Sequence, residues 1–296
     1  MRCPDLAEIL PARPGKGKAR FWLGVLIPLV LALAGYGALC RWFFVHQHEF
    51  QFGDQRAPRV SPQSVGLGGF AAVDLMTEDG ERLDAWWLPP PEPGRGVVLF
   101  LHGTPGTLAD TVWRLPDLQK SGFGVMAIDY RGYGASTGTP SEAGLRLDAR
   151  AAFDWIRNAA PGSKIAVFGE SLGTGPAIAL ARDRPVAGVL LNSPYASVRR
   201  LFELKAPPLP YRWLMRDQFD SEALIGGIGV PLMILHGTAD GAIPIGEARR
   251  LYAAAHEPKT MIEVEGVGHL AAYDSGGEGP ALEALARWTA PSAPAH

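Results

Sequence analysis

Cysteine is scarce in this chain: its 296 residues include only Cys3 and Cys40, both within the first forty positions. This scarcity excludes a disulfide-stapled scaffold and a cysteine-rich zinc module. An excess of positive charge is also missing, because the formal net charge is −2, which argues against nucleic acid as the main partner. The sequence has no H-E-x-x-H motif and no cluster with metal-ligand spacing, so we expect no metal and no cofactor. Apolar residues, in contrast, make up 47% of the chain, as in globular proteins with a large core.

One long run, from Phe21 to Cys40, lacks any charged residue, and Arg20 and Arg41 flank it. A helix of that length, rising about 1.5 Å per residue, spans the roughly 30 Å hydrocarbon core of a bilayer. The run therefore predicts a transmembrane anchor over residues 21–45. Two other interpretations stay open, namely a signal peptide cleaved near Ala32-Leu33-Ala34 and a buried helix of a soluble protein.

Basic residues are concentrated before the apolar run. Residues 1–60 hold eight Lys and Arg against four Asp and Glu, and five of the eight precede the run. The positive-inside rule then predicts a cytoplasmic leader at residues 1–20 and a large domain on the extracytoplasmic, periplasmic side. We expect a linker at residues 46–65, the domain at residues 66–290 and a flexible tail at residues 291–296.

Short apolar runs alternate with amphipathic stretches of helix length after the expected linker. A hairpin comes first, with β-like segments at Ala72–Thr77 and Arg82–Leu88 around the turn Glu78-Asp79-Gly80. Uniformly apolar strands are typical of a parallel sheet covered on both faces, so we predict a mostly parallel, doubly wound α/β sheet whose ligands bind at the carboxyl ends of the strands. The further strands are expected at Val97–Leu101, Val125–Ile128, Ile165–Phe168, Val186–Leu191, Leu232–Leu235 and Met261–Val264, and helices at Ser141–Asn158, Leu172–Arg182 and Ile245–Ala255.

A G-x-S-x-G pentapeptide at residues 169–173 is the first candidate for chemistry. A predicted strand ends at Gly169 and a predicted helix begins after Ser171, which is the strand–turn–helix setting of a nucleophile elbow. The turn is so tight that a Cβ at either glycine would clash with its surroundings. We therefore predict that Ser171 is a nucleophile held above the sheet near a helix N-terminus. The alternative is a glycine-rich turn without chemistry.

A nucleophilic serine needs a base, and the base needs an acid that orients it. His269 is the candidate base, because it follows the last strand in the glycine-loosened loop Gly266–Leu270. Asp240 is the candidate acid, because it follows the strand Leu232–Leu235 and gives the order serine, acid, histidine. The competing acids Asp217, Asp220 and Glu222 have no strand before them, and an elbow directs Glu170 elsewhere. The other histidines (His46, His48, His102, His236, His256 and His296) are expected to have no role in the chemistry.

The oxyanion of an acyl-transfer reaction needs backbone N–H donors. The amide of Leu172, directly after the candidate nucleophile, is the first expected donor. The loop at residues 102–107 follows the strand Val97–Leu101, and because Pro105 has no N–H, the amide of Thr104 is the natural second donor. The alternative is a glycine-rich loop without a role in binding.

These motifs together resemble an α/β hydrolase from about Ala72 to Trp288. The resemblance is greatest to the membrane-anchored serine hydrolases grouped with monoglyceride-lipase-like and palmitoyl-thioesterase-like members, and it implies the α/β-hydrolase fold with a small lid. Such proteins often carry Asn where this chain has Thr104, and a polar residue where it reads Leu270-Ala271-Ala272. The resemblance implies structural roles for Asp129 and Arg131. The motifs are LHGTPG at 101–106, DYRGYGAS at 129–136, GESLGTGPA at 169–177, SPY at 193–195, HGTADGAIP at 236–244 and GVGHL at 266–270.

These features indicate a serine hydrolase that cleaves carboxylic ester or thioester bonds through an acyl-enzyme. The expected lid, at about residues 194–230, is rich in apolar residues such as Phe202 and Trp213, which suit an acyl chain or simply pack the lid. Two alternatives stay open: an amidase or aminopeptidase on the same fold, and a non-catalytic ligand-binding protein. The expected partners are a small acyl substrate and, through the apolar helix, a membrane.

Overall fold

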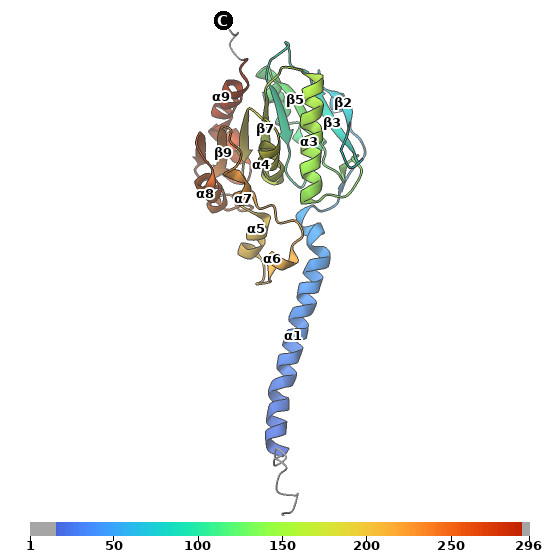
Figure 1. Ribbon diagram of the computed structural model, residues 1–296, viewed down its shortest axis with the longest axis vertical. Coiled ribbons are helices and arrows are strands. Elements are labelled where there is room, and N and C mark those ends of the chain that lie inside the picture. Colours follow the sequence, from blue (N-terminus) through green and yellow to red (C-terminus); the bar gives the residue numbers. More distant parts are fainter. Residues whose placement is uncertain (1–15, 292–296) are drawn as a thin grey trace, which may run out of the picture. The chain divides into compact units, whose positions relative to one another are not determined.

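The computed structural model describes residues 16–291, with side chains from Arg20 onward. It divides into two compact parts, one up to Gln47 and one from His48 (Figure 1). Most of the expected leader and all of the expected tail after residue 291 lie outside the described residues.

From Lys16 onward, the first part is one uninterrupted helix. Helix α1 (Lys16–Gln51) contains the whole predicted span, with Pro28 inside it, and its last turn already belongs to the second part. Its apolar window has a mean hydropathy of 2.2, and none of that window is buried. By length and composition, this helix could cross a membrane or serve as a signal sequence.

The second part is built on an eight-stranded sheet in the order β10-β9-β8-β7-β4-β5-β3-β2. The hairpin strands β2 and β3 pair antiparallel, as does β3 with β5, and all other neighbours in this sheet are parallel. The predicted hairpin and the predicted mostly parallel sheet are thus confirmed, with ends that differ by up to two residues. The strands are β2 (Ala71–Met76), β3 (Arg82–Leu88), β4 (Val97–Leu101), β5 (Gly124–Ile128), β7 (Ile165–Glu170), β8 (Gly188–Asn192), β9 (Leu232–Gly237) and β10 (Lys259–Val264).

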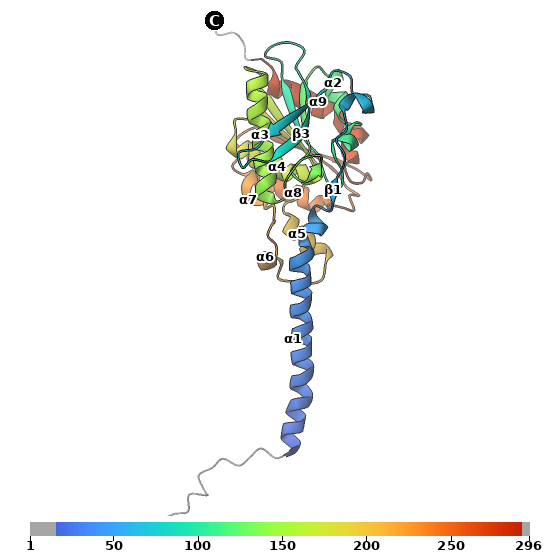
Figure 2. The same ribbon diagram turned by 90° about the vertical axis from the view of Figure 1, so that its right-hand side faces the viewer.

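Helices cover both faces of this sheet, as the apolar strands require. Helices α3 (Glu142–Ala159), α4 (Thr174–Asp183) and α8 (Ile245–Ala254) pack on one hydrophobic core, while α2 (Leu115–Lys120) and α9 (Glu278–Thr289) pack on the other. Figure 2 shows α3 and α2 on opposite sides of the sheet. The three helices predicted within the domain are confirmed within two residues, apart from a 3₁₀ turn that precedes α4.

Helix α3 illustrates why these stretches are helical. Its buried side chains recur every three or four residues, among them Leu145, Ala149 and Phe153, so one face enters the core. The Ser141 hydroxyl caps its N-terminus by accepting a hydrogen bond from the Gly144 amide.

The expected lid region holds three short helices, α5 (Val198–Lys205), α6 (Tyr211–Leu214) and α7 (Ser221–Ile225). Helix α5 has no buried residue, and Trp213 of α6 is 81% exposed. The expected linker holds the end of α1, the short strand β1 (Gln55–Arg56) and the 3₁₀ turn η2 (Pro62–Val65). Strand β1 pairs in parallel with β6 (Tyr133–Gly134), outside the main sheet.

Candidate active site

Ser171 lies at the start of a 3₁₀ turn, η4 (Ser171–Gly173), between β7 and α4. Its φ of 48° is in the left-handed region, which a non-glycine residue seldom adopts. A Cβ at Gly169 would lie 2.6 Å from the Gly173 carbonyl oxygen, and a Cβ at Gly173 would lie 2.0 Å from the Leu101 carbonyl oxygen. Both glycines are therefore required by close backbone approach, as the pentapeptide suggests.

Ser171, His269 and Asp240 lie within hydrogen-bond distance of one another in a row. His269 Nε2 is 3.0 Å from Ser171 Oγ, and His269 Nδ1 is 2.7 Å from Asp240 Oδ2. Asp240 follows β9 and His269 follows β10, so the carboxyl ends of three parallel strands bring together residues that lie up to 98 positions apart.

The Asp240 carboxyl is held in the ionised state. Burial opposes its ionisation, but hydrogen bonds from His269 and from the Ile243 amide outweigh burial and lower its pKa. The Ala242 and Ile243 amides both donate to Asp240 Oδ1, at 2.8 Å each. Because an ionised carboxylate only accepts hydrogen bonds, the proton of neutral His269 is placed on Nδ1, which leaves Nε2 free to accept from the Ser171 hydroxyl.

The end of β8 holds the loop that carries His269. The Leu270 amide donates to Ser193 Oγ at 3.0 Å, and the Asn192 side-chain amide donates to the Leu270 carbonyl at 3.0 Å. Leu270 itself has a φ of 63°, so these bonds hold it in a conformation that is costly for leucine. Asn192 is not among the residues predicted from the sequence; the signal that could have identified it is a polar residue at the end of a fully buried strand.

The other strand-end histidines stabilise turns, as the sequence suggests. His236 Nε2 donates to the Ile243 carbonyl at 2.8 Å, and burial lowers the pKa of this imidazole. His102 Nδ1 donates to the Gly103 carbonyl at 2.7 Å. The competing acids bond elsewhere: Asp217 to the amide of Glu142, Asp220 to the amide of Ala223, and Glu222 to Arg250.

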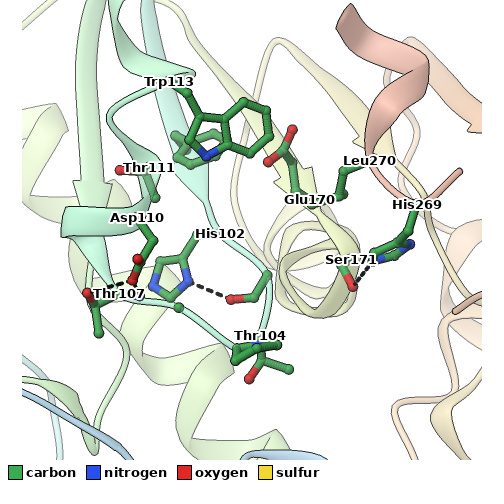
Figure 3. A pocket seen from close by; sticks show the side chains of 14 residues that line it. His102, Thr104, Thr107, Asp110, Thr111, Trp113, Glu170, Ser171, His269 and Leu270 are labelled. Atoms are coloured by element: carbon green, nitrogen blue, oxygen red, sulfur yellow. Dashed lines mark hydrogen bonds between the residues drawn. The ribbon is translucent and has the colours of Figure 1, made fainter.

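A cavity of about 270 Å³ opens over the candidate residues (Figure 3). Within the described residues, its lining includes Ser171, His269 and Thr104 but no residue of the expected lid, 194–230. Its wall includes two carboxylates, those of Asp110 and Glu170, and no lysine or arginine. The lining is Phe100, His102, Gly103, Thr104, Pro105, Gly106, Thr107, Asp110, Thr111, Trp113, Glu170, Ser171, His269 and Leu270.

Glu170 lies in that wall and is bonded away from His269. Its Oε1 accepts from Arg114 Nε and from the Asn192 side-chain amide, each at 3.0 Å. Arg114 is fully buried, also pairs with Asp274 at 3.0 Å, and lies 3.6 Å from the centre of the Tyr273 ring. This network joins four segments beside the cavity, and burial is the main reason that the pKa of Glu170 is raised.

The two expected oxyanion donors flank Ser171. Leu172 follows it in η4, and Thr104 lies in the loop after β4, which packs closely on the serine: a Cβ at Gly103 would lie 3.0 Å from Ser171 Cβ. The Thr104 hydroxyl accepts from Tyr133 Oη at 3.2 Å.

The two residues for which the resemblance implied structural roles make structural contacts. Asp129 accepts from the Leu108 amide at 2.8 Å, and Arg131 pairs with Asp148 and Asp79. Within residues 16–291, no group of three or more His, Cys, Asp or Glu side chains is placed to hold a metal ion.

A family model, curated relatives and solved structures all match this chain. Residues 96–223 match the model of the alpha/beta hydrolase fold family. The chain is 36% identical to the uncharacterised protein Rv2307c of Mycobacterium tuberculosis, over 81% of this chain and 86% of that protein. It is 33% identical to the lysophosphatidylserine lipase ABHD12 of Macaca fascicularis, over 66% of this chain and 58% of that protein. The Pyrococcus furiosus esterase Pf2001 superposes with a TM-score of 0.65 at 21% identity, covering 80% of this chain and 99% of the esterase.

Proposed function

The chain belongs to the alpha/beta hydrolase fold family, and from that premise we propose that it is a serine hydrolase that cleaves carboxylic ester or thioester bonds. The observation that carries the proposal is the pair of hydrogen bonds from Ser171 to His269 and from His269 to Asp240. A nucleophile that is hydrogen-bonded to a base, which is in turn hydrogen-bonded to an orienting acid, is the arrangement that serine-dependent acyl transfer needs.

In the proposed reaction, Ser171 Oγ attacks the acyl carbon while its proton moves to His269 Nε2. Asp240 stabilises the imidazolium and keeps the ring oriented through Nδ1. The tetrahedral adduct collapses when the carbon–oxygen or carbon–sulfur bond breaks, and His269 returns the proton to the leaving alcohol or thiol. Water, deprotonated by His269, then attacks the acyl-enzyme and releases the carboxylic acid and free Ser171.

The amides of Leu172 and Thr104 are the proposed donors to the oxyanion of both tetrahedral adducts. The close packing of Gly103 on Ser171 supports this proposal, because it keeps the Thr104 loop beside the reacting oxygen. A Cβ at position 103 would also lie 3.3 Å from the Glu170 carbonyl, so the approach depends on glycine.

For substrates, we propose neutral acyl esters or thioesters. Phe100, Trp113 and Leu270 line the cavity with apolar surface, which suits an acyl chain. Asp110 places a carboxylate in the same wall, whereas the Glu170 carboxyl is paired with Arg114, so Asp110 is the group that disfavours an anionic substrate at that position. We also propose that residues 194–230 form a lid, and its exposed Trp213 and Leu204 are available to contact a lipid-like substrate.

Labelling with a fluorophosphonate tests this proposal, because such a probe reacts with an activated serine. We expect wild-type protein to be labelled at Ser171 alone and to hydrolyse p-nitrophenyl esters of graded chain length faster than aminoacyl anilides. Faster hydrolysis of the anilides would favour an amidase or aminopeptidase, and folded wild-type protein that is not labelled would favour a ligand-binding protein.

We further propose that α1 anchors the chain in a membrane with the hydrolase part on the extracytoplasmic side. The uninterrupted length of α1 supports a membrane span, and the basic residues before the apolar run support this orientation. A reporter that is active only in the periplasm, fused to the C-terminus, should give a signal. A stronger signal from a reporter that is active only in the cytoplasm would reverse the orientation and leave the chemistry unaffected.

A further inference from the structure

The segment that follows the apolar helix contacts the loop of the candidate oxyanion donor. We call residues 48–57 the strap; the whole strap belongs to the compact part that starts at His48. Strap residue Gln55 accepts a hydrogen bond from the Gly106 amide through Oε1, at 3.0 Å. Gly106 is two positions after Thr104 in the loop that lines the cavity, so the strap holds this loop directly.

The Gln55 amide is itself held in position. Its Nε2 donates to the Phe52 carbonyl at 3.1 Å, and the same carbonyl accepts a longer bond from the Thr104 hydroxyl at 3.4 Å. Gly53 lies between these residues with a φ of 65°, and a Cβ there would lie 2.9 Å from Gln55 Nε2. The strap therefore makes a compact turn whose polar atoms face the loop.

The strap is fixed to the body of the domain at three further points. His48 Nε2 donates to the Pro140 carbonyl at 3.1 Å, and the Ala57 amide donates to the Gly134 carbonyl at 3.0 Å. Phe52 is 1% exposed, with its ring 6.1 Å from that of Phe219. A segment anchored on both sides of Gln55 is a rigid support for the loop that Gln55 contacts.

The loop needs support at this position because its own sequence supplies little. Gly103 and Gly106 are conformationally free, Gly106 has a φ of 141°, and Pro105 has no N–H to donate. Tyr133 binds the Thr104 side chain and Asp110 binds the Thr107 amide at 2.8 Å, so Gln55 holds the point between these two contacts.

We propose that Gln55 is a positioning residue for the reaction: it holds the loop at residues 103–107 so that the Thr104 amide faces the oxyanion. This inference rests on the proposed function and deepens it. It makes the residues directly after the apolar helix part of the hydrolase site. Gln55 itself does not touch the substrate; it acts through Gly106.

Kinetics of Gln55→Ala in the full-length chain test this proposal, with active sites counted by fluorophosphonate so that unfolded molecules do not contribute. We expect kcat per active site to fall about 10- to 100-fold, because small displacements of a reacting group have effects of this size. KM for a short p-nitrophenyl ester should stay nearly constant. Binding of a trifluoromethyl ketone, which mimics the tetrahedral adduct, should weaken by a similar factor, since both depend on the oxyanion contact.

Three further variants sharpen the test. Gln55→Glu keeps the acceptor for the Gly106 amide but loses the donor to Phe52, so it should retain more activity than Gln55→Ala. Gly53→Ala displaces the Gln55 amide and should lower kcat in the same direction. The matched control is Gln119→Ala, which removes another glutamine bridge, to the Gly68 carbonyl, away from the cavity and should leave kcat unchanged.

The possible failures have different signatures. Wild-type protein without labelling or turnover would contradict the proposed function. Normal wild-type turnover together with an unchanged kcat and unchanged ketone affinity in Gln55→Ala would overturn the role of Gln55. Hydrogen exchange at the Gly106 amide gives a readout that needs no turnover: we expect faster exchange in Gln55→Ala, and unchanged exchange would also overturn the proposal.

Discussion

The two walls of the cavity are built in different ways. The histidine wall, Ser171 with His269 and Leu270, is held by hydrogen bonds among groups at the ends of the parallel strands. His269 bonds to the side chains of Ser171 and Asp240, and the Leu270 amide donates to Ser193 Oγ. The glycine wall, residues 102–107, is held by hydrogen bonds to several other segments. Gln55 binds the Gly106 amide, Tyr133 binds the Thr104 hydroxyl, and Tyr130 binds the His102 carbonyl. The Thr104 hydroxyl also donates to the Phe52 carbonyl, and Asp110 accepts from both the amide and the hydroxyl of Thr107. The position of the histidine wall is therefore set by the strands of the sheet, whereas the position of the glycine wall is set by the segments that pack against it.

The two walls should therefore respond differently to substitution. A substitution in the histidine wall removes a proposed reacting group, so kcat should fall by a large factor and the fold should stay intact. A substitution in the glycine wall displaces the proposed Thr104 donor without removing it, so kcat should fall by a smaller factor. Arg114 connects the two walls, because it follows the glycine wall in sequence, binds Glu170 next to Ser171, and binds Asp274 beyond His269.

The largest effect should come from the histidine wall. Ser171→Ala and His269→Ala should each lower kcat about 10⁴-fold or more, because the residues of such a relay act as a unit. Asp240→Asn should retain somewhat more activity, since it preserves the fold of the loop and only weakens control of the imidazole. Steady-state kinetics with a p-nitrophenyl ester measures all three.

The thermal midpoint of Ser171→Ala should barely change, because the substitution deletes a single oxygen. Labelling of His269→Ala at the wild-type rate would show that another residue is the base. His269 would then not be the base that activates Ser171.

Breaking the link between the walls should mainly reduce stability. Arg114→Met leaves the buried Glu170 without its cation and should cost about 3–5 kcal/mol in the free energy of unfolding, measured by urea denaturation. Adding Glu170→Gln should restore part of that loss, because the neutral amide no longer needs the cation. A double variant that is no more stable than Arg114→Met would contradict the ion-pair explanation.

A substitution in the glycine wall should lower kcat by a smaller factor than a substitution in the histidine wall. In Gly103→Ala the new methyl would approach Ser171 Cβ to 3.0 Å, so either the loop or the serine must shift by a few tenths of an ångström. We expect kcat to fall about 10- to 100-fold with a small change in stability, since a misplaced donor weakens oxyanion binding. Gly68→Ala, where a Cβ would meet nothing within 4 Å, is the matched control. Equal kcat values for the two variants would show that the loop need not approach Ser171.

The smallest effect concerns His236, which lies behind the histidine wall. Burial lowers the pKa of this imidazole below its ordinary value of 6.5, so the unfolded chain takes up the proton first as the pH falls. The stabilisation that neutral His236 contributes is therefore complete above about pH 6.5 and is lost as the pH decreases below it, by at most about 1.4 kcal/mol per pH unit.

Denaturation of wild type and His236→Gln between pH 7.5 and 5 measures that contribution. The free energy of unfolding should fall less steeply with decreasing pH in the variant. Parallel curves would mean that His236 is protonated equally in both states.

The sequence alone predicted the strands, helices and turns whose formation depends on residues close together in the chain. Uninterrupted apolar runs indicate the strands of a covered parallel sheet, and the long uncharged run indicates α1, because burial or membrane insertion follows from composition over a few turns of chain. The hairpin at Glu78-Asp79-Gly80 has its own turn signal. Ser171, Asp240 and His269 could be proposed together because each follows a predicted strand, and parallel strands bring their carboxyl ends to one edge.

Only the tertiary structure decided which distant side chains support these residues. Gln55 contacts Gly106 across 51 positions, Asn192 contacts Leu270 across 78, and Arg114 contacts Asp274 across 160. A polar side chain has no periodicity or turn preference that identifies its partner, because its hydrogen bonds depend on which segments the packed core places beside it. The proposed reacting groups can therefore be read from order along the chain, whereas the contacts that hold them in position arise when the whole domain is folded.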